Sequence, residues 1–252
     1  IYKKNVVVLK NCEKAEQLAA ALSLSMVTEI KPEIDLYLAY YFDQLYLCAM
    51  DGKQELKVSV DFDSAKTELR RQRIGLKSEP LLRAVGCNSK NELTVLDATA
   101  GFGRDAFLLA NYHCKVTLVE ESPIVAAILQ DGIDRASQLN DLSNVMQQMQ
   151  LVNQSSTDFL ETTENNYDVI YLDPMFPPRA KSAKVKKDMQ LLHRLLGRVD
   201  EALNEKLLSI ARQKALKRVV VKRPKTANFL ADASPSYSLN TKAMRFDVYQ
   251  IA

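Results

Sequence analysis

A short segment, Asp173-Pro-Met-Phe176, has the residue types that position an amine for group transfer. It follows the apolar run 167–172, which would deliver the Asp173 carboxylate to the end of a buried strand. That carboxylate and the Pro174 carbonyl can accept the two hydrogens of an amine on a nucleic-acid base and aim its lone pair at an electrophile. Phe176 can stack on the flipped base. In isolation the segment could be a proline-rich turn. In this chain it predicts chemistry on an exocyclic amine, with Asp173, Pro174 and Phe176 as catalytic residues.

A glycine-rich segment, Asp97-Ala-Thr-Ala-Gly-Phe-Gly103, has the form of a cofactor-binding turn. Its glycines, Gly101 among them, let the backbone pass close to a ligand, and the helix expected after them presents free N–H groups. Read as G-x-G-x-x-A, the turn could hold a dinucleotide pyrophosphate, with Glu120 on the ribose. Asp97 favours another ligand, because a carboxylate would repel a pyrophosphate but can meet the ammonium of a methionine group. Together with the Asp173 segment, which a dehydrogenase does not need, it predicts S-adenosyl-L-methionine as the cofactor.

Further candidate cofactor contacts follow the next two predicted strands. Glu120 and Glu121 could accept hydrogen bonds from the two ribose hydroxyls. Ser155 and Ser156 could reach the adenine edge, or could cap the helix that follows them. Since ligands bind beyond the carboxyl ends of strands in an open α/β sheet, all four residues stand where a cofactor would lie.

The pattern of elements indicates an α/β protein. From about residue 79 onward, strand and helix patterns alternate, which is typical of a parallel sheet covered on both faces. Two adjacent strand patterns at 236–240 and 243–250 predict a C-terminal antiparallel hairpin. The first seventy or so residues indicate a small α/β appendage with a meander, so we expect domains at 1–74 and 75–252. The other strands expected in the second domain are 94–97, 115–120, 149–153, 167–172 and 218–221.

The composition argues against a membrane protein, a secreted disulfide-rich protein and a zinc protein. An apolar content of 47% and a charged content of 26% are ordinary for a soluble chain, and no apolar run approaches the ~18 residues of a membrane helix. No signal peptide is visible. The four cysteines, none at C-x-x-C spacing, and two histidines predict neither a zinc site nor a disulfide framework. We therefore expect a cytoplasmic protein that needs no metal.

Basic residues gather beside the predicted chemical centre. A lysine-rich run directly follows the Asp173 segment, an arginine cluster ends the appendage, and Lys222-Arg-Pro-Lys225 forms a third group. Charge runs are usually solvated faces, but one that adjoins a reaction centre favours binding to RNA phosphates. The candidate RNA-binding residues are Arg70, Arg71, Arg73, Arg179, Lys181, Lys184, Lys186 and Lys187.

Five segments, in this order, closely resemble the bacterial RsmJ family of 16S ribosomal RNA (guanine-N2)-methyltransferases. The resemblance covers the chain from about Phe62 to its end, whereas the first sixty residues match loosely. The segments are Asp97-Ala-Thr-Ala-Gly-Phe-Gly-Arg-Asp-Ala-Phe107, Tyr171-Leu-Asp-Pro-Met-Phe-Pro177, Lys181-Ser-Ala-Lys-Val-Lys-Lys187, Lys217-Arg-Val-Val-Val-Lys-Arg-Pro224 and Arg245-Phe-Asp247.

The resemblance implies a class I (Rossmann-like) methyltransferase with a seven-stranded, mostly parallel sheet. It also implies a substrate, the N2 amine of guanine 1516 in 16S ribosomal RNA, either naked or in the small ribosomal subunit. Where the family often has Glu-Arg, this chain has Glu120-Glu121, so the second contact could be through the backbone alone. The implied cofactor contacts are Arg104, Asp105, Glu120, Glu121, Ser155, Ser156 and Asp173.

Three other functions remain open at the level of the residues. Methylation of adenine N6 in DNA or RNA would use the same Asp-Pro-x-aromatic logic. A nicotinamide-dependent oxidoreductase could be built on the glycine-rich turn. A non-catalytic RNA-binding protein could have kept the fold.

Overall fold

The computed structural model describes residues 6–72, 75–88, 92–175, 187–197 and 201–251. Contacts along the chain group them into two compact units, each described by itself. The first consists of residues up to 60, residues 127–132 and the described part of 176–199; the second contains the rest. The predicted domain boundary at residue 74 stays a prediction.

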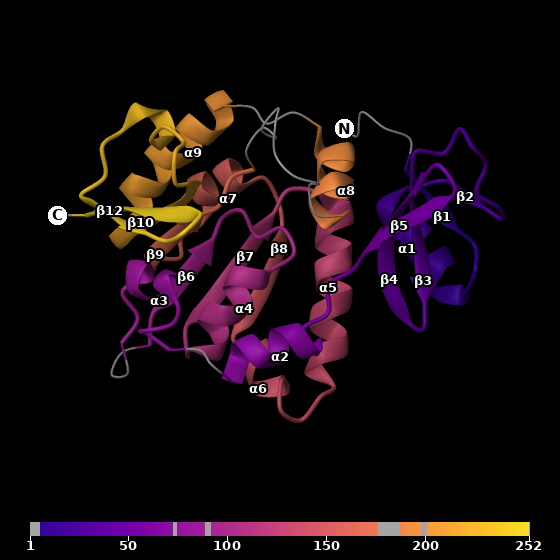
Figure 1. The fold of residues 1–252 in the computed structure, drawn as a ribbon, viewed down its shortest axis with the longest axis horizontal. Coiled ribbons are helices and arrows are strands. Elements are labelled where there is room, and N and C mark those ends of the chain that lie inside the picture. Colours follow the sequence, from indigo (N-terminus) through magenta and orange to yellow (C-terminus); the bar gives the residue numbers. More distant parts are fainter. Residues whose placement is uncertain (1–5, 73–74, 89–91, 176–186, 198–200, 252) are drawn as a thin grey trace. The chain divides into compact units, whose positions relative to one another are not determined.

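The second unit is built on a seven-stranded sheet with the order β11-β12-β10-β9-β6-β7-β8 (Figure 1). The five strands from β8 to β10 run parallel, and β12 runs antiparallel to both β10 and β11. The sequence-based prediction of a mostly parallel sheet closed by a C-terminal hairpin is confirmed. The strands are β6 (Thr94–Asp97), β7 (Lys115–Glu120), β8 (Met149–Asn153), β9 (Tyr167–Leu172), β10 (Ala215–Pro224), β11 (Tyr237–Asn240) and β12 (Met244–Gln250).

Helices cover both faces of this sheet, which explains why its central strands are apolar almost without interruption. On one face, Leu96, Ile170 and Val219 form a buried cluster with residues of α7 and α9. The side chains that alternate with them point to the other face, where the Tyr171 hydroxyl reaches α4. The helices are α2 (Ala65–Gln72), α3 (Pro80–Val85), α4 (Arg104–Asn111), α5 (Pro123–Ser137, of which residues 127–132 are grouped with the first unit), α6 (Ser143–Met146), α7 (Ser156–Thr162) and α9 (Glu201–Lys214), with a 3-10 turn, η1 (Leu230–Asp232).

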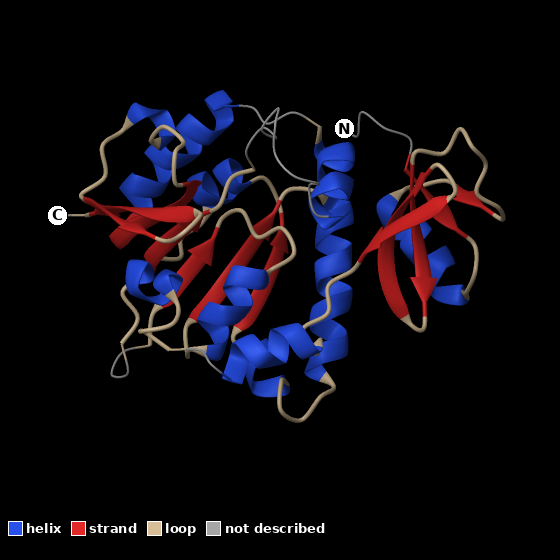
Figure 2. Ribbon diagram, in the orientation of Figure 1, coloured by secondary structure: helices blue, strands red, loops and turns tan. Residues whose placement is uncertain are grey.

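The first unit contains a five-stranded sheet with the order β2-β1-β3-β4-β5, whose strands are labelled in Figure 1 and drawn as red arrows in Figure 2. Strands β3, β4 and β5 form the antiparallel meander that the alternating sequence predicts. Helix α1 packs on β1 and β3, and α8 packs on β5. The elements are β1 (Val6–Leu9), α1 (Glu13–Leu22), β2 (Met26–Val27), β3 (Leu36–Tyr41), β4 (Gln44–Asp51), β5 (Gln54–Val58) and α8 (Lys187–Leu196).

Candidate active site

The carboxyl ends of three neighbouring parallel strands bring the predicted site residues together. Asp97 ends β6, Glu120 ends β7, and Asp173 directly follows β9. Strand β6 lies between the other two, with Asp97 opposite Tyr171 of β9 and Leu118 of β7. Because parallel strands present their carboxyl ends on one edge, the three carboxylates share the edge where ligands of open α/β sheets bind.

The glycine-rich turn requires glycine at two positions. Gly101 and Gly103 have φ angles of +53° and +67°, in the left-handed region that other residues adopt only with strain. The Gly101 N–H donates to Glu120 Oε2 at 2.9 Å, and the Ser122 N–H donates to Glu120 Oε1 at 2.8 Å. Burial raises the pKa of Glu120, and these two N–H groups offset part of that rise. Both carboxylate oxygens of Glu120, the residue predicted to bind the ribose hydroxyls, are therefore held by backbone N–H groups.

Thr99 joins the cofactor turn to the catalytic segment. Its hydroxyl accepts a hydrogen bond of 2.6 Å from the Asp173 N–H, and its own N–H donates to Asp97 Oδ1 at 3.1 Å. One residue thus forms hydrogen bonds with both predicted centres. Thr99 was not among the predicted site residues, although a threonine inside a glycine-rich turn is a recognisable signal.

Asp97 is a buried carboxylate that forms no ion pair with any described residue. It is 2% exposed, and burial raises its pKa to about 8, with the charges of Asp105 and Asp173 adding to the rise. A carboxylate in such surroundings gains most from a cation brought by a ligand. This observation fits the ammonium of the methionine group of S-adenosylmethionine, which Asp97 was predicted to meet.

The raised pKa of Asp97 has a consequence for stability. Its folded-state pKa lies above the ordinary value of 3.8, so between that value and about 8 Asp97 binds more protons in the folded protein than in the unfolded chain. The contribution of Asp97 to the free energy of unfolding must then fall as pH rises through this range, by about 1.4 kcal/mol per pH unit at most. We expect ligand-free Asp97→Asn protein to gain stability over wild type as pH rises from 5 to 8, measured by denaturant unfolding. Exposed Asp158→Asn is the control, and a pH-independent difference for Asp97→Asn would contradict the reasoning.

Lys222 lies between two carboxylates at the end of β10. Its Nζ is 2.7 Å from Asp105 Oδ2 and 2.7 Å from Asp173 Oδ2, and the Tyr171 hydroxyl donates to Asp105 Oδ2 at 2.7 Å. Burial tends to lower the pKa of Lys222, but the two carboxylates raise it well above its ordinary value. Burial acts to raise the pKa of Asp105, but the neighbouring Lys222 ammonium lowers that pKa below its usual value. For Asp173 the effect of burial is larger than that of Lys222, so the pKa of Asp173 is raised. Lys222 was predicted only as part of a basic cluster near the C-terminal hairpin, whereas in the structure it is paired inside the site.

The other predicted cofactor residues lie around this centre. Arg104 begins α4, with its guanidinium 5.7 Å from the Phe102 ring centroid. The Ser156 hydroxyl donates to the Ala98 carbonyl, which ties α7 to the glycine-rich turn. Ser155 occupies the N-cap position of α7, but its side chain accepts no capping hydrogen bond. The Glu121 carbonyl accepts from Asn153 Nδ2 at 3.3 Å.

The predicted RNA-binding residues divide into two groups. Arg70 forms two hydrogen bonds of 2.8 Å with Glu79, and Arg71 pairs with Glu68 and Asp141, so their charges are partly balanced. Their contact with RNA stays a prediction. Outside the described residues lie Phe176 and the basic residues Arg73, Arg179, Lys181, Lys184 and Lys186; of Lys187, only the position at the start of α8 is described.

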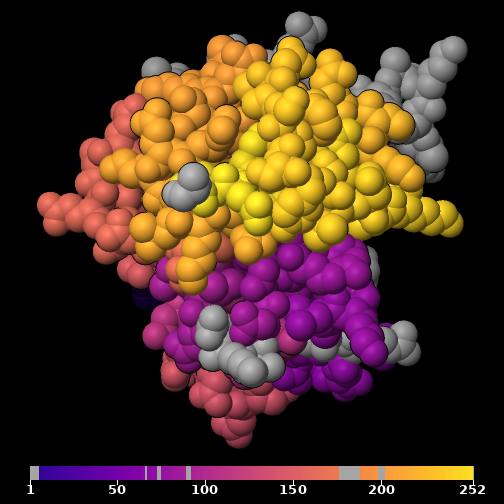
Figure 3. All heavy atoms as spheres, turned by 90° about the vertical axis from the view of Figure 1, so that its left-hand side faces the viewer, coloured from indigo at the N-terminus to yellow at the C-terminus, as the bar shows by residue number. Residues whose placement is uncertain are grey.

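A hollow of about 220 Å³ opens beside Lys222. The C-terminal strands lie against the segment that holds α3, as the yellow and purple surfaces in Figure 3 show. The hollow is lined by Arg70, Glu79, Pro80, Leu81, Asp105, Lys222, Thr241, Met244 and Phe246.

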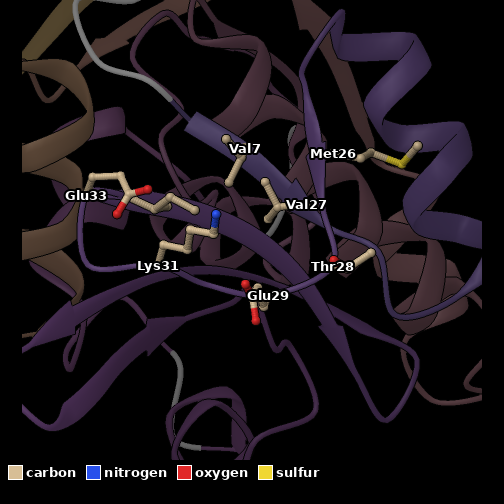
Figure 4. A pocket seen from close by; sticks show the side chains of 8 residues that line it. Val7, Met26, Val27, Thr28, Glu29, Lys31 and Glu33 are labelled. Atoms are coloured by element: carbon tan, nitrogen blue, oxygen red, sulfur yellow. The ribbon is translucent and has the colours of Figure 1, made fainter.

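Another hollow, of about 510 Å³, lies in the first unit beside β1 and β2 (Figure 4). It is lined by Val7, Met26, Val27 and a following loop that contributes Glu29, Lys31 and Glu33, and no predicted site residue reaches it. In the described part of the chain, no helix is long and apolar enough to cross a membrane, and no His, Cys, Asp and Glu side chains gather in a group that could hold a metal ion.

The fold is that of the S-adenosylmethionine-dependent methyltransferases, as comparison with known proteins shows. Residues 7–251 match the family described as "Putative SAM-dependent methyltransferase". A crystal structure of a SAM-dependent methyltransferase from Neisseria gonorrhoeae shares 34% identity and a TM-score of 0.76, covering 97% of this chain and 95% of that one.

Similar proteins that share one enzyme name identify the family more narrowly. Two proteins named ribosomal RNA small subunit methyltransferase J are similar, from Thioalkalivibrio sulfidiphilus (42% identity, 94% of this chain, 92% of that protein) and Coxiella burnetii (39%, 94% and 91%). The chain belongs to this family of S-adenosylmethionine-dependent methyltransferases, as the five segments predicted. Its cofactor is S-adenosylmethionine, and a nicotinamide-dependent oxidoreductase is not favoured.

Proposed function

We propose that this protein transfers a methyl group from S-adenosylmethionine to the exocyclic N2 amine of a guanine in 16S ribosomal RNA. The observation that carries the proposal is the Thr99 link, which holds the Asp97 turn against the Asp173 segment. A cofactor at the first and an amine at the second would meet at short range. The names of the relatives, ribosomal RNA small subunit methyltransferase J, support ribosomal RNA as the substrate. Methylation of adenine N6 is not favoured.

The cofactor supplies a methyl carbon made electrophilic by the attached sulfonium. The chain supplies position: Asp173 and the Pro174 carbonyl accept the hydrogens of the N2 amine and aim its lone pair, and Phe176 stacks on the base. No strong base is required, because the amine becomes acidic once it carries the methyl group. Its proton passes to Asp173, whose raised pKa suits it to accept one. The cofactor contacts proposed are Asp97, Gly101, Arg104, Asp105, Glu120, Glu121, Ser155, Ser156 and Asp173.

We place the target at guanine 1516, in naked RNA or in the small ribosomal subunit, and the reaction in the cytoplasm. The test is the transfer of labelled methyl groups from S-adenosylmethionine to two small-subunit RNAs, one lacking the mark and one already carrying it. The unmarked RNA should accept about one methyl group and the marked RNA almost none. Equal labelling of both would contradict the proposed target, and labelling of neither would contradict the activity.

The lysine-rich run after Phe176 is expected to bind the RNA backbone. Reversing the charge of Lys181, Lys184 and Lys186 should weaken RNA binding and reduce its dependence on salt, since each phosphate contact contributes a slope of about −0.9 for duplex and −0.7 for single strands in log K against log salt. Filter binding over a range of salt concentrations measures both effects. Reversal of Lys206, which pairs with Glu161, serves as the control. An unchanged salt slope would show that these lysines do not contact phosphates.

A further inference from the structure

The Lys222 ammonium and the Asp173 carboxylate are neighbours because of the sheet order. Val221 of β10 lies opposite Leu172 of β9, so the next residue of each strand lies at the same level of the carboxyl edge. Asp105, from the start of α4, holds the ammonium from a second direction. The pair is therefore fixed by a strand on each side and by a helix.

Lys222 and Asp173 each have a hydrogen-bonding group that no described residue uses. An ammonium has three N–H donors, and described residues accept only two of those of Lys222, at Asp105 and Asp173. Asp173 uses Oδ2 for this contact, and its Oδ1 has no partner among the residues that the structure describes. One acceptor and one donor thus remain side by side at the reaction centre.

A guanine base presents the complementary pattern on its Watson–Crick edge. There the N2 amine and N1–H are donors and O6 is an acceptor, whereas adenine offers an acceptor at N1 and a donor at N6. We propose that Asp173 takes the donor side of this edge while Lys222 donates to O6, so that the ion pair selects guanine over adenine. The inference rests on the proposed function, because it concerns the same amine of the same base.

The hollow beside Lys222 adjoins the lysine side of the ion pair, because Lys222 and Asp105 line it and Asp173 does not. Its volume of about 220 Å³ is below the range of about 300–1,000 Å³ that accommodates drug-sized ligands. Leu81, Met244 and Phe246 contribute apolar surface against which a flat ring can pack. The Lys222 side chain is only 22% exposed, so a base without an acceptor at position 6 would leave its third N–H unpaired and shielded from water.

The test compares two RNAs that differ only at the target base, guanine or 2,6-diaminopurine. Diaminopurine keeps the N2 amine, but it has an amine in place of O6 and an unprotonated N1. Wild type should have a much higher kcat/KM for the guanine RNA. In Lys222→Gln the amide oxygen can accept from the 6-amine, so the ratio of kcat/KM for the two RNAs should fall by roughly 10- to 100-fold. Lys217→Gln, at the other end of β10, should keep the wild-type ratio.

The ratio separates a role in base selection from one in structure, because a loosened site slows both RNAs alike. Removal of Lys222 leaves Asp105 and Asp173 without their cation, so Asp105→Asn/Lys222→Gln provides a second variant with less buried charge. Lys222→Arg, which keeps the charge and a donor, should keep the preference for guanine. An unchanged ratio in Lys222→Gln or in the double variant, or no preference in wild type, would overturn the inference. If wild type methylates no guanine RNA, the proposed function itself fails.

Discussion

Asp173→Ala protein is expected to lose at least about 10²–10³-fold in kcat while it still binds the cofactor. The substitution removes the acceptor that aims the amine, and it leaves Lys222 with Asp105 as its remaining carboxylate partner. Losses of this size follow the removal of one positioned polar group at a reacting centre. Single-turnover methyl transfer to small-subunit RNA, with saturating cofactor, measures the effect directly.

Two measurements separate this loss from general damage. Calorimetry with S-adenosylhomocysteine should show that affinity falls much less than kcat, because Asp173 is one of several proposed cofactor contacts. Asp158→Ala, an exposed carboxylate at the start of α7, should retain wild-type turnover. If Asp173→Ala kept activity within tenfold of wild type, the catalytic assignment would be wrong.

Asp97→Ala protein is expected to bind S-adenosylmethionine roughly 30- to 1,000-fold more weakly than wild type. The estimate follows from the cost of truncating one partner of a buried, hydrogen-bonded charge pair, about 2–4 kcal/mol. The affected pair would be the Asp97 carboxylate and the methionine ammonium, in surroundings where Asp97 is 2% exposed. Titration calorimetry of the ligand-free protein gives the affinity.

The same titration tests whether Asp97 loses a proton when the cofactor binds. Its pKa of about 8 in the ligand-free protein means that it is largely protonated at pH 7, and a bound ammonium would lower that pKa. Wild type should therefore release a proton when it binds the cofactor at pH 7, which appears as a dependence of the binding heat on the ionisation enthalpy of the buffer. Asp97→Ala should lose this release. Unchanged affinity together with unchanged proton release would refute the role assigned to Asp97.

Local sequence patterns were sufficient to predict the fold of the second unit. Alternating strand and helix patterns predicted the parallel sheet, and the strand patterns at 236–240 and 243–250 predicted the hairpin. Strand β10 was underestimated: the sequence indicated 218–221, whereas the strand runs from Ala215 to Pro224. The charged residues near both ends of β10 argued against a longer buried strand. In the structure Lys217 pairs with Asp168, and Lys222 pairs with Asp105 and Asp173; these partners come close only when the sheet is assembled.

In the candidate site, too, local sequence patterns predicted the positions of residues but not the contacts between residues far apart in the sequence. Asp97, Glu120 and Asp173 were predictable, since each ends an apolar strand and the carboxyl ends of parallel strands meet. The bonds that Asp173 makes to Thr99 and Lys222 were not predictable, because these residues lie 74 and 49 positions away. One signal was present: a lysine directly after three valines in a central strand must find a counter-charge if it is buried.

The identity of the modified nucleoside tests the central claim most directly. Small-subunit RNA lacking the mark, incubated with the protein and isotopically labelled S-adenosylmethionine, is digested to nucleosides and analysed by mass spectrometry. The proposed function predicts label in N2-methylguanosine, at about one per RNA molecule. Label in N6-methyladenosine, or no label in any nucleoside from protein that binds the cofactor, would contradict it.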